Sequence, residues 1–144
     1  MKIFLRSKNK FFHFEAENET GSKVQMDADV KIGGANLGAR PMELLLMGLG
    51  GCSAIDIVSI LKKQKQKINN FNIEIEGEKE KREGEETSLF SKIIMHFFLE
   101  GEIELSKAER AAKLSVEKYC SVGKTLELAG AKIDYKISVN EKKI

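Results

Sequence analysis

The chain of 144 residues has the length of a single domain, and we expect residues 1–144 to form one. Its 24 lysines and arginines nearly balance 22 aspartates and glutamates, so it has no charge excess of the kind that binds nucleic acid or acidic membranes. The first residues are charged, without an apolar run long enough for a signal peptide, which predicts a cytoplasmic protein.

Apolar and polar residues alternate through the first quarter of the chain. This pattern predicts three short strands, at Ile3–Leu5, Phe12–Phe14 and Val24–Ala28, with turn residues at positions 17–22 before the third. A glycine-rich loop follows at residues 33–41. It has neither the lysine and hydroxyl residue of a phosphate-binding loop nor the GxGxxG spacing of a dinucleotide site, which argues against a phosphate-binding role.

The segment from Arg40 to Lys65 is almost entirely apolar and predicts a long central helix that carries the first of only two cysteines, Cys52. It approaches the length of a membrane span, but Asp56 and three glycines favour a buried helix of a soluble protein. A helix that is apolar on every face cannot lie at the surface of a small monomer. A second copy of the same helix is the simplest cover, so we predict an obligate homodimer.

The rest of the chain predicts two strands, a helix and a final strand. Asn69 and Asn70 are expected to end the central helix, before strands at 71–76 and 89–99 that flank a charged hairpin with Gly84 near its turn. The second strand is apolar on both faces and should be central in its sheet. Its lone histidine, His96, is interpreted as a hydrogen-bonded core residue.

A helix is predicted to open with a capping box, formed by Ser106 and Glu109, and to deliver the second cysteine, Cys120. Gly123 should kink or break it, and a shorter helix should end at Gly130 before a last strand at 133–139. The sum is an α+β fold in which antiparallel sheets surround the central helix.

Cys52 has two interpretations. The glycines beside it, Gly48, Gly50 and Gly51, either allow tight helix packing around a small buried thiol or leave room for a substrate to reach sulfur. A reactive thiol needs a nearby cation to stabilise its thiolate. Arg40 and Arg6 are the candidates, with Arg40 preferred because it lies beside the loop before the helix, whereas Asp56 acts in the opposite direction.

Glu43 is the carboxylate nearest the start of the central helix. On an unbroken helix it lies on the opposite side from Cys52, so direct pairing requires a break or a partner subunit. Its simpler role is to offset the helix dipole. Cys120 precedes a short helix starting near Ser121, a position that favours its thiolate.

Two motifs in this order resemble the OsmC/Ohr superfamily. They are Pro41, Glu43, Gly50, Gly51 and Cys52, followed far downstream by Glu117, Lys118, Tyr119, Cys120, Ser121 and Val122. The resemblance covers nearly the whole chain. Met42 stands where Ohr-like members place a glutamate directly after the proline, so the chain resembles a divergent OsmC-like branch.

The resemblance implies an OsmC-like intertwined homodimer, with active sites at the interface and central helices wrapped by sheets. It implies a peroxidase of the oxidative stress response that reduces organic hydroperoxides with a dithiol reductant and no metal or other cofactor. Cys52 would be the peroxidatic residue and Cys120 the resolving one, with Arg40 and Glu43 in the site. The alternative is a non-catalytic dimeric protein that binds a small apolar or thiol-bearing molecule in a glycine-lined interface cavity.

Overall fold

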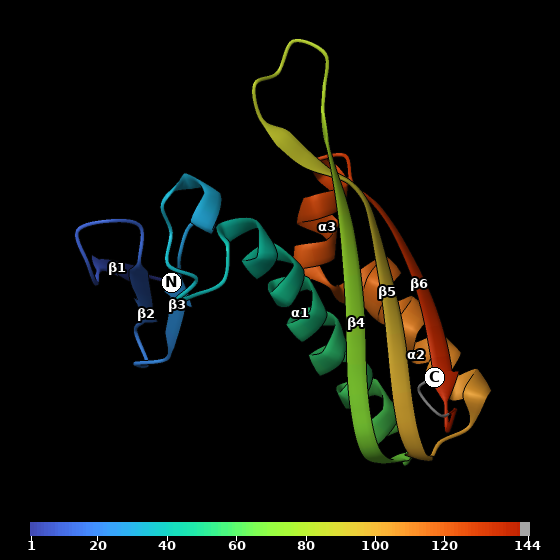
Figure 1. Cartoon of the computed structure of the whole chain (residues 1–144). Coiled ribbons are helices and arrows are strands. Elements are labelled where there is room, and N and C mark those ends of the chain that lie inside the picture. The colour runs from blue at the N-terminus through green and yellow to red at the C-terminus, as the bar shows by residue number, and fades with distance from the viewer. Residues whose placement is uncertain (142–144) are drawn as a thin grey trace. The chain divides into compact units, whose positions relative to one another are not determined.

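The protein has the α+β fold that the sequence predicts, as seen in a computed structural model that describes residues 1–141 (Figure 1). The chain forms two compact units, Met1–Leu45 and the part from Leu46 onward. Its elements, in chain order, are β1 (Ile3–Ser7), β2 (Phe14–Asn18), β3 (Lys23–Met26), the 3₁₀ turn η1 (Val30–Ile32), α1 (Pro41–Lys63), β4 (Lys67–Lys81), β5 (Ser88–Glu102), α2 (Leu105–Leu114), the π-helical turn η2 (Ser115–Tyr119), α3 (Ser121–Leu128) and β6 (Lys132–Val139).

The N-terminal unit contains three strands, as predicted, in an antiparallel sheet of the order β1-β2-β3. The second strand begins only at Phe14 and runs to Asn18, so the predicted Phe12 lies before it. The turn between β2 and β3 lies where its residues predicted it. The Asn18 side chain accepts hydrogen bonds from the backbone N–H groups of Thr20 and Ser22, at 3.0 and 2.9 Å. Gly21 has a φ of 83°, a conformation that residues with a Cβ rarely adopt.

The glycine-rich loop of the N-terminal unit is organised by one buried carboxylate. Asp27 accepts hydrogen bonds from the backbone N–H groups of Ala28 at 2.8 Å and of Ala35 and Leu37 at 3.0 Å each. These bonds, that of Leu37 first, hold the pKa of Asp27 below its ordinary value of 3.8 although burial opposes the shift. A Cβ at Gly34 would overlap the carbonyl oxygen of Ala28, so the loop needs glycine there.

Asp27 makes the stability of this loop dependent on acid. Because its pKa is depressed in the folded state, the contribution is complete at pH values above 3.8 and is lost as the pH falls through the lower, folded-state pKa. We expect the protection of the Ala35 and Leu37 amides against hydrogen exchange, relative to their intrinsic rates at each pH, to fall on acidification of the native chain. Asp27→Asn should exchange faster at pH 7 and lose this acid dependence. Equal protection of both amides in the two proteins at pH 7 would contradict this role.

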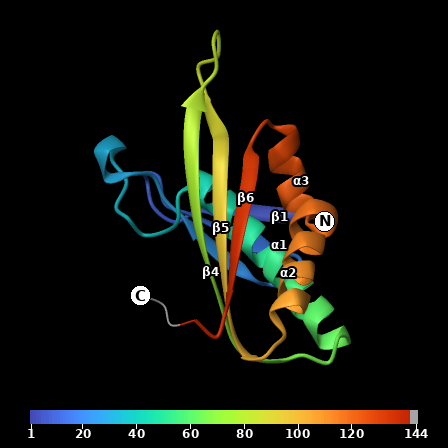
Figure 2. The same ribbon diagram turned by 90° about the vertical axis from the view of Figure 1, so that its right-hand side faces the viewer.

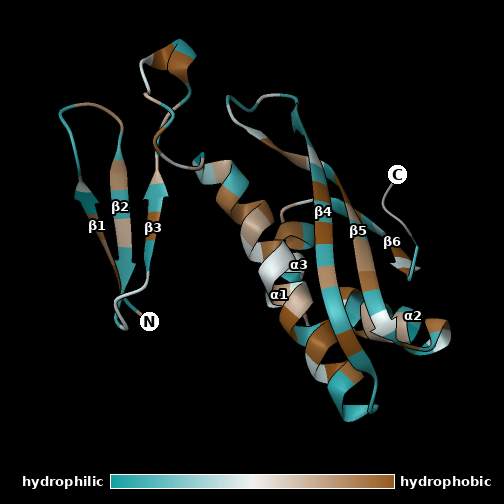
Figure 3. Cartoon of the chain, turned by 60° about the horizontal axis from the view of Figure 1, so that its bottom comes forward, coloured by the Kyte–Doolittle hydropathy of each residue, from teal (hydrophilic) through white to brown (hydrophobic). Residues whose placement is uncertain are grey.

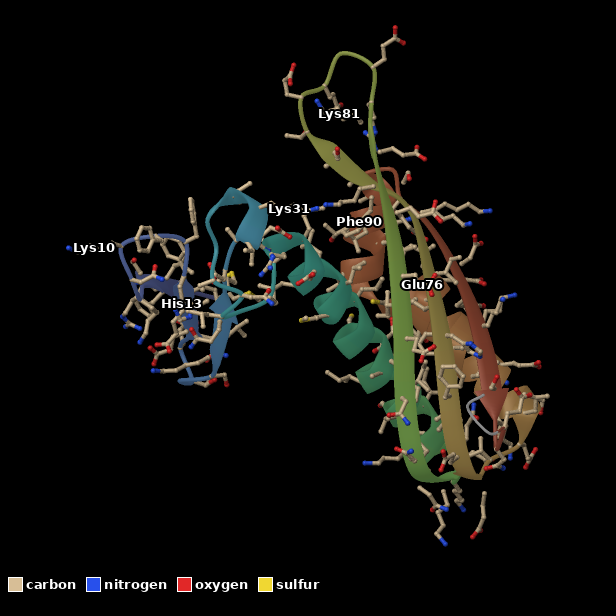
Figure 4. The ribbon with its side chains drawn as sticks, viewed as in Figure 1. Lys10, His13, Lys31, Glu76, Lys81 and Phe90 are labelled. Carbon is tan, nitrogen blue, oxygen red and sulfur yellow. The ribbon has the colours of Figure 1, made fainter. Side chains whose placement is uncertain are left out.

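The sheet of the C-terminal unit has the order β4-β5-β6, with the predicted central strand in the middle. β4 and β5 form a long antiparallel hairpin whose turn contains Gly84 with a φ of 78°. Figure 4 places Lys81 at the far end of this hairpin, beyond Phe90. β6 pairs with β5 in parallel, which differs from the expected antiparallel sheet. The reason is that α2 and α3 carry the chain back along β5 before β6 begins.

The helices of this unit lie on one face of the sheet (Figure 2). Alternate residues of β5 point toward them and are buried, among them Ile93, Met95, Phe97 and Leu99. The opposite face of β5 carries His96, whose Nε2 lies 2.9 Å from the Ser138 hydroxyl and whose ring stacks on Phe98 with centroids 3.9 Å apart. A partnered side chain agrees with the interpretation of His96 as a structural residue.

The central helix α1 runs unbroken, close to its predicted bounds. It ends at Lys63 because Lys65 adopts a left-handed conformation with a φ of 58°, whereas Asn69 and Asn70, the predicted terminators, lie within β4. The helix is apolar along much of its length (Figure 3) and long enough to cross a membrane by length and composition alone. Leu49, Ile57 and Leu61 are fully buried in the single chain, whereas Met47 and Ile55 are exposed.

The start of α2 differs from the predicted capping box. The helix begins at Leu105, so Ser106 already lies inside its first turn and cannot serve as its cap. Glu104 occupies the cap position, but its side chain makes no capping bond to a backbone N–H and instead pairs with the Lys107 side chain at 2.6 Å. Its carbonyl accepts from the N–H groups of Lys107 and Ala108, at 3.0 and 3.1 Å.

Candidate functional site

The two cysteines meet within the C-terminal unit, and both are free thiols. Cys52 lies on α1 and is half-buried, whereas Cys120 immediately precedes α3 and is only 2% exposed. Besides burial, the Cys52 side chain is near enough to raise the pKa of the Cys120 thiol, and the hydroxyl of Ser53, the next residue in the chain, lies 3.5 Å from the Cys120 sulfur. Two thiols far apart in the sequence are therefore in one buried cluster, with the more accessible one on the central helix.

A π-helical turn delivers Cys120 to this position. After α2, the turn η2 closes with a bond of 2.9 Å from the N–H of Cys120 to the carbonyl of Ser115, five residues earlier. Cys120 then leaves the helix with an extended backbone and caps α3, where its sulfur accepts a hydrogen bond from the N–H of Gly123 at 3.3 Å. The predicted break is therefore at Cys120 and not at Gly123, which lies inside α3.

Burial dominates the electrostatics of the second cysteine. Desolvation raises the pKa of Cys120, and the neighbouring Cys52 side chain raises it further, although bonds from Ser53 and Gly123 act in the opposite direction. The expectation that the start of a helix would favour its thiolate is therefore wrong. The penalty for placing a charge in this apolar setting exceeds the stabilisation that the N–H groups supply, and Cys120 is kept as a neutral thiol.

Two buried serines complete the cluster and were not predicted from the sequence. The Ser53 hydroxyl lies 3.5 Å from the Cys120 sulfur. The Ser115 hydroxyl lies 3.3 Å from the carbonyl oxygen of Ser53 and 3.4 Å from Oδ2 of Asp56. Ser53 directly follows the first cysteine, which could have drawn attention to it. Ser115 precedes Cys120 by five residues, and residues at this spacing are joined by a backbone hydrogen bond in a π-helical turn but not in an α-helix.

The glycines beside Cys52 have different neighbours. A Cβ at Gly50 would lie 2.7 Å from Cδ1 of Ile75, so this glycine allows α1 to pack closely against β4. A Cβ at Gly48 would reach Val122 at 3.9 Å, an ordinary contact, and one at Gly51 would meet no atom within 4 Å among the described residues. Tight helix packing therefore explains Gly50, whereas Gly51 is exposed at the surface of α1 in the single chain.

The other two predicted site residues belong to the N-terminal unit and contact each other. Glu43 Oε2 accepts a hydrogen bond of 2.8 Å from the backbone N–H of Arg40, which closes the first turn of α1 in the manner of a capping box. The Arg40 guanidinium donates to the Gly38 carbonyl at 3.0 Å and to the Asn36 side chain at 2.6 Å. The helix break that pairing of Glu43 with Cys52 inside one chain would need is not present in α1.

The four predicted site residues thus divide into two pairs, the cysteines in one unit and Arg40 with Glu43 in the other. Within residues 1–141, no three His, Cys, Asp or Glu side chains are grouped so that they could hold a metal ion. The chemistry that the cysteine pair itself can perform is thiol–disulfide exchange and oxidation by a peroxide, with Cys52 as the accessible sulfur.

Comparison with known proteins places this arrangement in a family. Protein YhfA of Escherichia coli is 40% identical over 117 residues, which cover 81% of this chain and 82% of YhfA. A crystal structure of a hypothetical protein from Aquifex aeolicus superposes with a TM-score of 0.76 at 28% identity and covers 97% of each chain. The organic hydroperoxide resistance protein OhrB of Bacillus subtilis shares the fold, with a TM-score of 0.67 at 15% identity, covering 95% of this chain and 96% of OhrB.

The residues that match the family model for OsmC-like proteins are 33–136, which include both cysteines, all of α1 and the whole β4–β5 hairpin. With this match and the identity to YhfA, the chain belongs to the OsmC-like protein family.

Proposed function

We propose that the protein is a thiol-dependent hydroperoxide reductase in which Cys52 reacts with the peroxide and Cys120 resolves the product. The observation that supports this most directly is the proximity of a half-buried and a buried free thiol, with the hydroxyl of Ser53, which follows Cys52, 3.5 Å from the Cys120 sulfur. An accessible sulfur can meet a substrate, and a neutral neighbour is protected from reacting first because its pKa is raised by burial.

The reaction proceeds in three balanced steps. The Cys52 thiolate attacks the peroxide, the O–O bond breaks, and the alkoxide takes up a proton to leave as an alcohol, with Cys52 now a sulfenic acid. The Cys120 sulfur attacks the oxidised Cys52 sulfur, and its thiol proton leaves with the hydroxide as water, which gives a disulfide. An external dithiol then reduces this bond by exchange and is itself oxidised to a disulfide.

The family relationship supports the same chemistry. OhrB carries hydroperoxide resistance in its name, and a structure from Legionella pneumophila with a TM-score of 0.71 at 15% identity is also described as an organic hydroperoxide resistance protein. At such identities the likeness concerns the fold, so the activity of this chain is our proposal. A role in oxidative stress defence in the cytoplasm belongs to the same proposal.

The remaining parts of the proposed site come from Arg40, Glu43 and a second copy of the chain. Arg40 would stabilise the Cys52 thiolate, with Glu43 fixing the backbone that carries it, as its bond of 2.8 Å to the Arg40 N–H allows. The homodimer is supported by exposed apolar side chains of α1, with Met47 at 57% and Ile55 at 72% exposure in the single chain.

The proposal is tested by measuring consumption of cumene hydroperoxide by the native protein with dithiothreitol as reductant. We expect turnover, together with an intrachain disulfide on a non-reducing gel after peroxide alone. Absence of consumption above that of dithiothreitol alone would refute the activity. The binding alternative predicts that outcome.

A further inference from the structure

The contacts of Ser115 suggest how the resolving cysteine is held in place. This serine has no exposed surface, and its carbonyl and hydroxyl face different partners. The carbonyl accepts the N–H of Cys120 at 2.9 Å, and the hydroxyl lies 3.4 Å from Asp56 and 3.3 Å from the Ser53 carbonyl. Ser115 therefore connects the backbone of the second cysteine to the helix that carries the first, in addition to the contacts of the Cys120 sulfur with the Ser53 hydroxyl at 3.5 Å and the Leu49 carbonyl at 4.0 Å.

We propose that Asp56 and Ser115 are positioning residues for the disulfide step, because together they fasten the π-helical turn η2 to α1 with the Cys120 sulfur beside Cys52. This inference rests on the proposed pairing of the two cysteines, but concerns residues for which neither the family motif nor the peroxide chemistry assigns a role. Asp56 acts here as a hydrogen-bond acceptor four residues after Cys52.

Asp56 is the residue of α1 whose side chain accepts a hydrogen bond from the turn η2. A π-helical turn is less stable than an α-helix and persists where surrounding contacts favour it. The hydroxyl of Ser115 has one proton for two acceptors, and the carbonyl of Ser53 is also a backbone group of α1. Asp56 is thus the side chain whose removal loosens the turn without altering the backbone of either helix.

A second hydrogen bond on the same turn provides a matched comparison. Glu117 accepts a bond of 3.1 Å from the Tyr135 hydroxyl, which ties the outer side of η2 to β6. This contact is solvent-exposed and involves neither cysteine. If the inner contact specifically positions Cys120, loss of the Tyr135 hydroxyl should leave the cysteine pair unaffected.

The disulfide step can be observed without a peroxide by using 5,5′-dithiobis(2-nitrobenzoate). The Cys52 thiolate attacks this reagent and releases one nitrothiobenzoate, which leaves a mixed disulfide on Cys52. Cys120 then attacks the Cys52 sulfur, its proton passes to solvent, and a second nitrothiobenzoate leaves as the protein disulfide forms. The second, concentration-independent release therefore reports the position of Cys120 in the full-length protein.

We expect Asp56→Ala and Ser115→Ala to slow the second release by about fivefold, the effect of losing one ordinary hydrogen bond, with little change in the first for Ser115→Ala, which keeps every charge. Asp56→Asn, which keeps an acceptor oxygen, should restore most of the rate, and Tyr135→Phe should retain the native rate. An unchanged second release in both alanine variants would overturn the inference, as would equal slowing in Tyr135→Phe.

This experiment separates the inference from the proposed function. A native protein that consumes no hydroperoxide but shows the two releases, with the second slowed by Asp56→Ala, would refute the peroxidase and retain the positioning role. A native protein with no intramolecular release would refute the positioning role, whatever its peroxide chemistry.

Discussion

Replacing Cys52 by serine is expected to abolish hydroperoxide consumption. Serine preserves the size of the side chain but its oxygen cannot be oxidised by a peroxide, so the first step of the proposed cycle is lost rather than slowed. Loss of a nucleophile that the whole cycle depends on typically lowers turnover by roughly a thousandfold or more. The measurement is the rate of cumene hydroperoxide loss with dithiothreitol, corrected for the reductant alone.

The matched control for this substitution is Cys120→Ser. Cys52 remains able to react once, so peroxide should still be consumed stoichiometrically and dimedone should label the sulfenic acid on Cys52. Because the resolving thiol is missing, excess peroxide should drive that sulfur irreversibly to sulfinic acid, detectable by mass spectrometry. Substantial peroxide turnover by Cys52→Ser, with Cys120→Ser inactive, would reverse the assigned roles and contradict the mechanism.

Phe97→Ala is expected to have the largest effect on stability. Phe97 lies on β5 with no exposed surface, and its ring centroid is 6.2 Å from that of Phe71 on β4 and 6.3 Å from that of Tyr135 on β6. Its removal takes apolar contacts from all three strands and leaves a cavity that they cannot fill. We expect the free energy of unfolding to fall by about 3–5 kcal/mol, measured by chemical denaturation of the purified chain.

Phe11→Ala is the control for this substitution because it removes the same atoms from a side chain that is 72% exposed. Its free energy of unfolding should stay within about 0.5 kcal/mol of that of the native protein. If the two variants lost similar stability, the β4-β5-β6 sheet would not depend on Phe97 as its central apolar residue. The denaturation midpoints should be compared at one protein concentration, since association of folded chains would raise both.

Local patterns in the sequence were sufficient for most of the secondary structure. Alternation predicted three strands in the first quarter of the chain, with β1 and β3 close to their places and β2 too early, and the apolar run ending in lysines placed α1 almost to the residue. Pro41 at the helix start and Gly130 after α3, with a φ of 98°, are where the sequence predicts them. These features depend on neighbours a few residues away, which a sequence displays directly.

The family could also be recognised from the sequence, because the residues around Cys52 and around Cys120 occur together and in order. The predictions were wrong at positions where the local sequence is compatible with more than one backbone structure. Ser106 and Glu109 have the spacing of a capping box, yet the helix had already begun at Leu105. Gly123 appeared to be a helix breaker, yet it lies inside α3, next to the Cys120 sulfur.

By itself, then, the sequence determined the α+β class, the order of its elements and the two cysteines as the candidate chemistry. Tertiary structure alone decided the parallel pairing of β6, the π-helical turn before Cys120 and the cluster of Ser53, Ser115 and Asp56 around the thiols. It also decided that burial raises the pKa of Cys120 although the residue caps a helix. The physical reason is that desolvation and side-chain contacts depend on residues distant in the sequence, whereas helix caps and periodicity depend on those nearby.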